Sequence, residues 1–193
     1  MSRNVSIVFH SVCGNNFLIA KEFYKEFNKY GAKVQILRVN DPNFEGLAKQ
    51  FAIASQYEND ILKIEEAKVE TLFDSDIIIF GSPTYFGNVS GAMKSFMDSF
   101  SPYWPEGKFW GKKVFSFTTC ANGEGGGDLC LNAMTIFAQH MGMLAVPVPG
   151  DLVAGESFPA YGLVHYVGDN SDLRPNGKII SAIKEMTGRL MNI

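Results

Sequence analysis

Short apolar runs alternate with longer amphipathic segments along the chain. The runs are rich in β-branched residues, which favour strands. Ile77–Gly81 is apolar at successive positions, as is typical of a central strand in a parallel sheet. Pro147 cannot donate a backbone hydrogen bond, so the last run is expected at a sheet edge. The five strands predicted in this way are Val5–His10, Lys33–Val39, Ile77–Gly81, Lys113–Thr119 and Leu144–Val148.

The segments between these runs carry apolar residues at helical spacing. Strand and helix alternate in order, which predicts right-handed crossovers and a parallel sheet with helices on both faces. With 193 residues, the chain is expected to form a single α/β domain over residues 1–193. Two long stretches, Asp41–Glu70 and Pro149–Asn176, interrupt the alternation, and long loops of this kind are typically functional or disordered. The predicted helices are Asn16–Tyr30, Ser90–Phe100, Asp128–Met141 and Lys178–Leu190.

Composition narrows the class of protein. A net charge of −3 argues against a nucleic-acid partner, which a basic patch would attract, and it is small for an acidic redox carrier. Three cysteines are an odd number in a chain long enough to need neither disulfides nor a structural metal, which predicts reduced thiols and a cytoplasmic location. The sequence has no signal-peptide pattern and no apolar run of membrane-spanning length, so a soluble protein is expected.

The candidate chemistry follows the first, third and fourth predicted strands, because ligands of open parallel sheets bind beyond the carboxyl ends of the strands. The first loop runs directly into a helix and offers hydroxyl and amide donors, one glycine and free helical N–H groups, which suit a phosphate. It lacks the three glycines of the dinucleotide fingerprint and the Walker lysine, so a monophosphate fits better than a longer phosphate chain. An ordinary capped turn is the alternative. The loop consists of Ser11, Val12, Cys13, Gly14, Asn15 and Asn16.

The loop after the third strand contains an aromatic pair, and its glycine lets backbone approach a ligand closely. It suits a flat ring; the alternative is that both aromatics cover the core. The loop after the fourth strand is glycine-rich, and its N–H groups can point at the edge of an electron-rich ring. Asp128 is expected to cap the next helix and Glu124 to be solvated. The candidate residues of these two loops are Pro83, Thr84, Tyr85, Phe86, Gly87, Thr119, Cys120, Ala121, Asn122, Gly123 and Glu124.

These three loops together resemble the FMN-binding loops of flavodoxin-like proteins, and most closely those of the WrbA-type NAD(P)H:quinone oxidoreductases. The match is specific over GSPTYFGNVSGAMKSFMD (Gly81–Asp98), and Trp104 stands at the family's spacing for a tryptophan that lines the active site. Further matching segments are Gly111-Lys112, Thr118–Gly127, Gly142-Met143 and Pro159–Gly162.

The resemblance implies a doubly wound, flavodoxin-like sheet of five parallel strands in the order 2-1-3-4-5. It also implies that residues 11–16 hold the FMN phosphate and that residues 83–87 and 119–124 hold the isoalloxazine ring, with the N–H groups of Ala121–Glu124 facing the pyrimidine edge. The cofactor would carry the chemistry without a catalytic side chain or a metal. This chain departs from the family pattern at Cys13 and at His140-Met141, where a tyrosine and paired histidines are common.

The activity implied is the transfer of two electrons from NADH or NADPH to a quinone or a similar flat acceptor, which Phe86 and Trp104 would sandwich. The resemblance also implies a homotetramer or homodimer, because the matching tryptophan of the family reaches the flavin pocket of an adjacent chain. A flavodoxin-type electron carrier without its own substrate is the alternative. A regulator that binds FMN or a partner without catalysis is a third.

Overall fold

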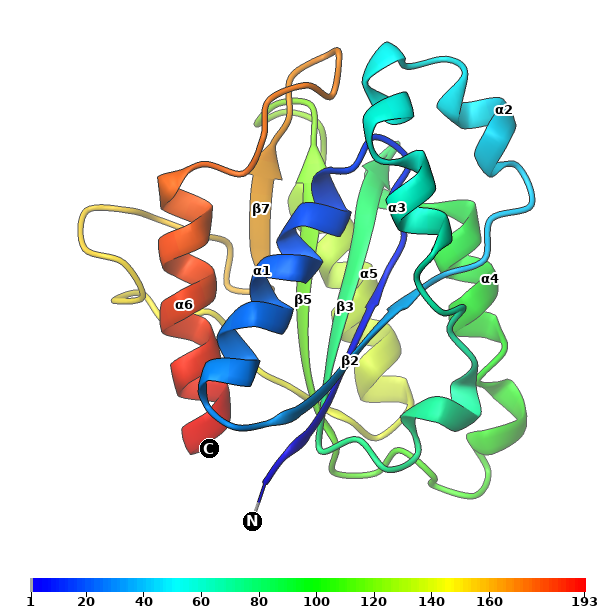
Figure 1. Ribbon diagram of the computed structural model, residues 1–193. Helices are drawn as coiled ribbons and strands as arrows, with labels where there is room; N and C mark the ends of the chain where they lie inside the picture. The colour runs from blue at the N-terminus through cyan, green and yellow to red at the C-terminus, as the bar shows by residue number, and fades with distance from the viewer. Residues whose placement is uncertain (1) are drawn as a thin grey trace.

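The computed structural model describes residues 2–193 as a parallel sheet between two layers of helices (Figure 1). Its main strands are β1 (Asn4–Phe9), β2 (Lys33–Arg38), β3 (Ile77–Tyr85), β5 (Lys113–Cys120) and β6 (Leu144–Ala145), ordered β2-β1-β3-β5-β6. Numbered in chain order, this is the expected order 2-1-3-4-5, and neighbouring strands are parallel throughout. The predicted flavodoxin-like topology is confirmed.

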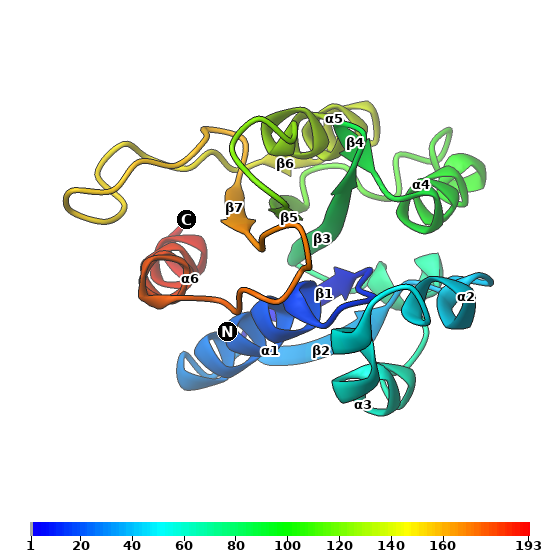
Figure 2. The same ribbon diagram turned by 90° about the horizontal axis from the view of Figure 1, so that it is seen from above.

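Alternation along the strands divides the core into two clusters, because successive side chains of a strand point to opposite faces of the sheet. Ile7 of β1 and Ile79 of β3 lie in the cluster that packs on α1 (Asn15–Lys29) and α6 (Gly177–Asn192). Val8 and Phe80 lie in the other cluster, against α4 (Gly91–Asp98) and α5 (Gly127–His140). Figure 2 shows the two helical layers on either side of the sheet.

The edge position next to β5 is occupied by two separate segments. β6 pairs with Lys113–Val114, at the start of β5, and β7 (Leu163–Tyr166) pairs with Phe117–Cys120, at its end. The prediction of one continuous strand over Leu144–Val148 is therefore wrong beyond Ala145. Pro147 has no N–H to donate, and Val148 donates to Ala160 O at 2.9 Å instead of to β5. Val146 N still donates to Val114 O at 2.8 Å, so it is residues 147–162 that leave the sheet and return to it.

Two further boundaries differ from the sequence predictions. β3 continues to Tyr85 and forms a short hairpin with β4 (Asn88–Val89), so residues 82–85 are strand. Asp128 is not the cap of its helix, because Gly126, in a left-handed conformation, holds the N-cap position and Asp128 lies in the first turn. Ser90 and Asn176 do cap their helices, accepting from Met93 N and Ile179 N.

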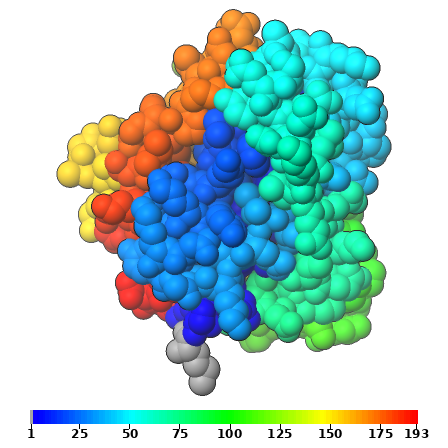
Figure 3. Space-filling model, in the orientation of Figure 1, coloured from blue at the N-terminus to red at the C-terminus, as the bar shows by residue number. Residues whose placement is uncertain are grey.

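The long polar stretch after β2 forms short helices: α2 (Phe44–Ala48), α3 (Glu58–Leu62) and the 3-10 turns η1 (Ala52–Gln56) and η2 (Val69–Leu72). A further 3-10 turn, η3 (Ser101–Tyr103), follows α4. The segment of residues 50–60, cyan in Figure 3, faces the segment after β7, orange, across the amino end of α1. No helix within residues 2–193 has the length and hydropathy that crossing a membrane requires.

Candidate functional site

The three predicted loops meet at the carboxyl edge of the sheet, the side that faces the viewer in Figure 2. They enclose a cavity of about 200 Å³ at this edge. Its lining includes Ser11, Val12, Cys13, Asn15, Asn16, Pro83, Thr84, Tyr85, Thr119, Cys120 and Ala121. The structure therefore brings most of the candidate residues together. Gly14, Phe86, Gly87, Asn122, Gly123 and Glu124 belong to the same loops without lining the cavity.

The first loop presents a row of unused backbone donors. The N–H groups of Ser11 through Phe17 donate to no atom of residues 2–193, and Gly14, the N-cap of α1, offers no side-chain oxygen to the first turn of the helix. The loop is held in shape by its asparagines: Asn16 Nδ2 donates to His10 O at 3.0 Å, and Asn15 Nδ2 donates to Ser171 O at 2.8 Å. Free N–H groups at a helix amino end suit a phosphate group, so this loop fits the FMN phosphate.

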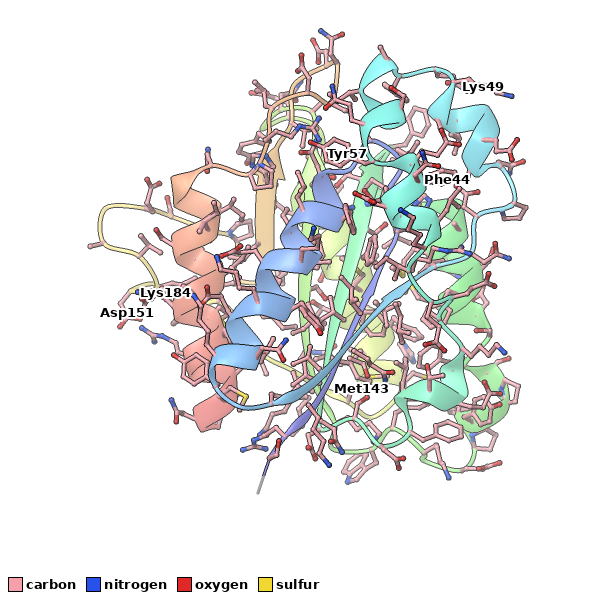
Figure 4. The ribbon with its side chains drawn as sticks, viewed as in Figure 1. Phe44, Lys49, Tyr57, Met143, Asp151 and Lys184 are labelled. Atoms are coloured by element: carbon pink, nitrogen blue, oxygen red, sulfur yellow. The ribbon has the colours of Figure 1, made fainter. Side chains whose placement is uncertain are left out.

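Gly14 is required by both the backbone and the packing of this loop. Its φ of +89° lies in the region that side chains disfavour, and a Cβ placed there would lie 2.4 Å from the ring of Tyr57. Figure 4 shows Tyr57 beside the amino end of α1. The Tyr57 ring therefore packs directly against the backbone of the first loop at Gly14.

The second loop separates its two aromatics. Tyr85 lines the cavity, and desolvation raises the pKa of its hydroxyl to about 12, so the phenol stays neutral at any physiological pH. Phe86 has a φ of +51° and a side chain that is fully exposed, so it does not cover the core. Gly87 packs closely against Gly126 and Leu129 at the amino end of α5, which fixes the hairpin tip over the cavity edge.

The third loop also exposes backbone donors. The N–H groups of Ala121, Asn122 and Gly123 find no acceptor within residues 2–193, while the side chain of Asn122 accepts from Glu124 N at 3.1 Å. Glu124 is exposed, as expected. Consecutive free N–H groups beside a cavity fit the carbonyl and nitrogen acceptors at the edge of a flavin ring.

A fourth loop, which follows β7, completes the cavity and was not among the candidates. Its lining residues are Val167, Gly168, Asp169 and Ser171, with Phe51 added from the region of η1. Val167 N and Gly168 N donate to Cys120 O at 2.8 Å and Ala121 O at 3.0 Å. The signal was present in the sequence: an apolar run at 163–167 directly before Gly168-Asp169 repeats the strand-then-polar-loop pattern of the other three loops.

Trp104 lies at the opposite edge of the sheet in its own chain. Its indole Nε1 donates to His140 O at 2.9 Å, at the last residue of α5, whereas Phe86 lies near the first turn of that helix. A helix of 14 residues is about 21 Å long, at about 1.5 Å per residue. Trp104 and Phe86 are therefore not brought together within one chain, and the His140-Met141 departure also lies far from the cavity.

A buried, hydrogen-bonded pair of side chains lies directly behind the first loop. His10 Nε2 and Asp41 Oδ2 are 3.0 Å apart, with side chains that are 2% and 6% exposed. The hydrogen bond from His10 holds the pKa of Asp41 below its ordinary value of 3.8. Because the folded state lowers this pKa, the stabilisation is present above pH 3.8 and is lost as the pH falls through the lowered value.

Asp41→Asn is expected to lower the free energy of unfolding by about 1–3 kcal/mol at pH 7, because it leaves a buried imidazole without its charged partner. The difference from the unsubstituted protein should shrink as the pH falls to 3. Urea unfolding at pH 7, 5 and 3 measures it. Asp60→Asn is the matched control, since the Asp60 carboxylate is 60% exposed and 3.6 Å from Lys63 Nζ. Equal stability of the two variants at pH 7 would contradict the expectation.

Proteins of similar sequence are named for FMN or for quinones, in agreement with a cavity that suits FMN. The model of the family described as NADPH-dependent FMN reductase matches residues 8–156. The chain is 32% identical over 145 residues to a protein of Archaeoglobus fulgidus named NAD(P)H dehydrogenase (quinone), covering 75% of this chain and 76% of the relative. An Aromatoleum aromaticum protein of the same name is 34% identical over 148 residues, covering 75% and 70%.

Solved structures show the same fold. A WrbA-like flavodoxin of Agrobacterium tumefaciens superposes with a TM-score of 0.70 at 20% identity, covering 99% of this chain and 96% of that one. Oxidised flavodoxin 1 of Bacillus cereus gives a TM-score of 0.67 at 14% identity, covering 98% and 97%. The family match includes the first three loops of the cavity, and this chain belongs to the NADPH-dependent FMN reductase family.

Proposed function

We propose that the protein is an FMN-dependent oxidoreductase that transfers two electrons from NADH or NADPH to a quinone or a similar flat acceptor. The observation that carries the proposal is the pair of free N–H rows, Ser11–Phe17 and Ala121–Gly123, on two sides of one cavity. One row suits a phosphate and the other suits a polar ring edge, which are the two ends of FMN. The names of the curated relatives support the donor and the acceptor.

Bound FMN supplies the hydride chemistry, and the protein orients the cofactor and tunes its environment. Residues 11–16 would bind its phosphate through backbone N–H groups. The N–H groups after β5 would face the ring edge and stabilise negative charge there, because they are fixed before the reaction begins. Thr84 Oγ1 and Thr118 Oγ1, 2.8 Å apart, hold the ends of β3 and β5 together beneath the ring site. Tyr85, neutral at physiological pH, would offer an uncharged aromatic wall.

A flavodoxin-type electron carrier is the second candidate, favoured by the solved structures of that fold. The modest charge of −3 and the named activity of the curated relatives favour the enzyme. Steady-state oxidation of NADH and NADPH with a benzoquinone separates the two, since only the enzyme turns over both substrates without a protein partner. FMN-loaded protein that is reduced by neither nicotinamide would overturn the proposal.

The protein is expected to bind one FMN per chain and to prefer FMN over riboflavin, because the first loop recognises the phosphate. Titration of the apoprotein with each flavin, followed by the change in flavin fluorescence, measures both affinities. Equal affinity for FMN and riboflavin would show that residues 11–16 do not bind the phosphate.

The proposed assembly is a homotetramer or homodimer in the cytoplasm. The Trp104 side chain is 61% exposed, although large aromatic side chains are usually buried in a core or an interface. In an oligomer, Trp104 of one chain would cover the flavin site of another, which explains its distance from the cavity of its own chain. All three cysteines are free, as expected in a reducing compartment. Light scattering tests the assembly; an active monomer at micromolar concentration would exclude the shared site.

A further inference from the structure

Arg174 reaches the first loop from the other end of the chain. It stands in the connection between β7 and α6, and its Nη1 donates to Cys13 O at 2.9 Å. Its Nε donates to Asp172 O at 3.1 Å, and its Nη2 donates to Ser171 O. Three backbone carbonyls thus hold the guanidinium in one place, half-buried beside the row of free N–H groups.

Tyr57 fixes the same guanidinium from a third segment. The carbon Cζ of Arg174 lies 5.1 Å from the centre of the Tyr57 ring, which is the geometry of a cation–π contact. The same ring also packs on Gly14, where an added Cβ would overlap it. Arg174, Tyr57 and Gly14 therefore form a layered contact at the amino end of α1.

The charge of Arg174 has no carboxylate partner. Within residues 2–193 no Asp or Glu oxygen lies within 4.0 Å of its guanidinium nitrogens, although guanidinium groups pair readily with carboxylates. Arg174 does not itself line the cavity, whose lining includes Asp169. A fixed cation that is hydrogen-bonded to a loop of N–H groups without acceptors is nevertheless complementary to an anion held by that loop.

We propose that Arg174 is a positioning residue for the FMN phosphate. Its hydrogen bond fixes the carbonyl of Cys13 so that the N–H groups of residues 11–16 stay free, and its positive charge stabilises the phosphate dianion beside them. Although the loop itself carries no cation, the loop after β7 supplies one. This inference rests on the proposed function, since it assumes that the phosphate of FMN occupies the first loop.

The test compares the affinities of FMN and riboflavin for the apoprotein and its variants, by flavin fluorescence. Arg174→Gln is expected to weaken FMN binding by about tenfold, the scale of one charge-assisted contact, and riboflavin binding by less than about twofold. Arg174→Lys keeps the charge but cannot bond all three carbonyls in the same geometry. Its FMN affinity should therefore lie between those of Arg174→Gln and the unsubstituted protein. Arg189→Gln removes the same charge from α6, where Arg189 pairs with Asp151, and should match the unsubstituted protein.

A second readout is ionic strength. Raising the salt concentration should narrow the FMN affinity difference between the unsubstituted protein and Arg174→Gln, because salt screens the charge. Equal weakening of both flavins by Arg174→Gln would mean that the residue only supports the loop, and no weakening of either would overturn the inference directly. If circular dichroism shows that Arg174→Gln does not fold, the inference is tested with Arg174→Lys. That variant should lose affinity for FMN but not for riboflavin.

The outcomes also separate this inference from the proposed function. If the unsubstituted protein does not prefer FMN over riboflavin, the phosphate role of the first loop fails and this inference fails with it. If it prefers FMN and both Arg174 variants keep the full preference, only the role of Arg174 is overturned.

Discussion

Gly14→Ala is expected to weaken FMN binding at least tenfold and to lower the free energy of unfolding by about 2–4 kcal/mol. Two costs add at this position. A side chain in the left-handed region costs about 1–2 kcal/mol, and the new Cβ would overlap the Tyr57 ring at 2.4 Å. The ring also contacts Arg174, so its retreat would disturb a second contact. We therefore expect the first loop to shift, and its N–H groups to shift with it.

Gly31→Ala is the matched control for this experiment. Gly31 ends the first helix with a φ of +72°, and no atom lies within 4 Å of a Cβ placed there. It therefore carries the conformational cost without the overlap, and it is far from the cavity. Urea unfolding of the apoproteins and FMN titration measure the two effects. Similar losses of stability in the two variants, with unchanged FMN affinity in Gly14→Ala, would show that the Tyr57 contact is not restrictive.

Trp104→Ala is expected to lower quinone turnover about tenfold or more while leaving FMN affinity within about twofold. The expectation follows from the proposed oligomer, in which Trp104 of one chain lies over the acceptor site of another, since buried aromatic anchors at interfaces contribute about 2 kcal/mol or more. FMN affinity should persist because no residue of the 101–112 segment lines the cavity proposed to bind FMN. Steady-state kinetics with a benzoquinone and FMN titration give the two measurements.

Trp110→Ala is the control for the Trp104 experiment. Trp110 stands on the same segment, is 81% exposed and packs against Gly142 at the amino edge of the sheet. The Trp110→Ala variant should keep a turnover number within about twofold of that of the unsubstituted protein. Equal losses of turnover in the two variants would attribute the effect to the segment as a whole, and full activity of Trp104→Ala would exclude the shared site.

The family resemblance predicts the order of the strands, and alternation along each strand predicts which side chains share a face of the sheet. Ile7 and Val8, or Ile79 and Phe80, fall into opposite core clusters as their positions require. Three of the four loops of the cavity were also predictable, since each follows a clear apolar strand. The division of the edge strand was not predicted. Pro147 marks an edge, and the run at 163–167 is compatible with a strand, but neither feature indicates that this run pairs with the end of β5.

The contacts that shape the first loop were beyond sequence reasoning for a different reason. Tyr57 stands 43 residues after Gly14 and Arg174 stands 160 residues after it, and neither stands in a motif. The positions of Phe86 and Trp104 could not be predicted from the sequence for a similar reason. Their residue types suggest stacking on a flat ligand, while their separation along α5 becomes visible only when the chain is folded.

The hydrogen bonds that join the first loop to the loop after β7 have a consequence for synthesis on the ribosome. The bond from Asn15 to Ser171 spans 156 residues and the bond from Arg174 to Cys13 spans 161, in a chain of 193. The first loop therefore leaves the ribosome more than 150 residues ahead of these partners. A nascent chain can form β1, β2 and β3 while it is still being made. We expect it to capture the cofactor only after Arg174 has left the exit tunnel.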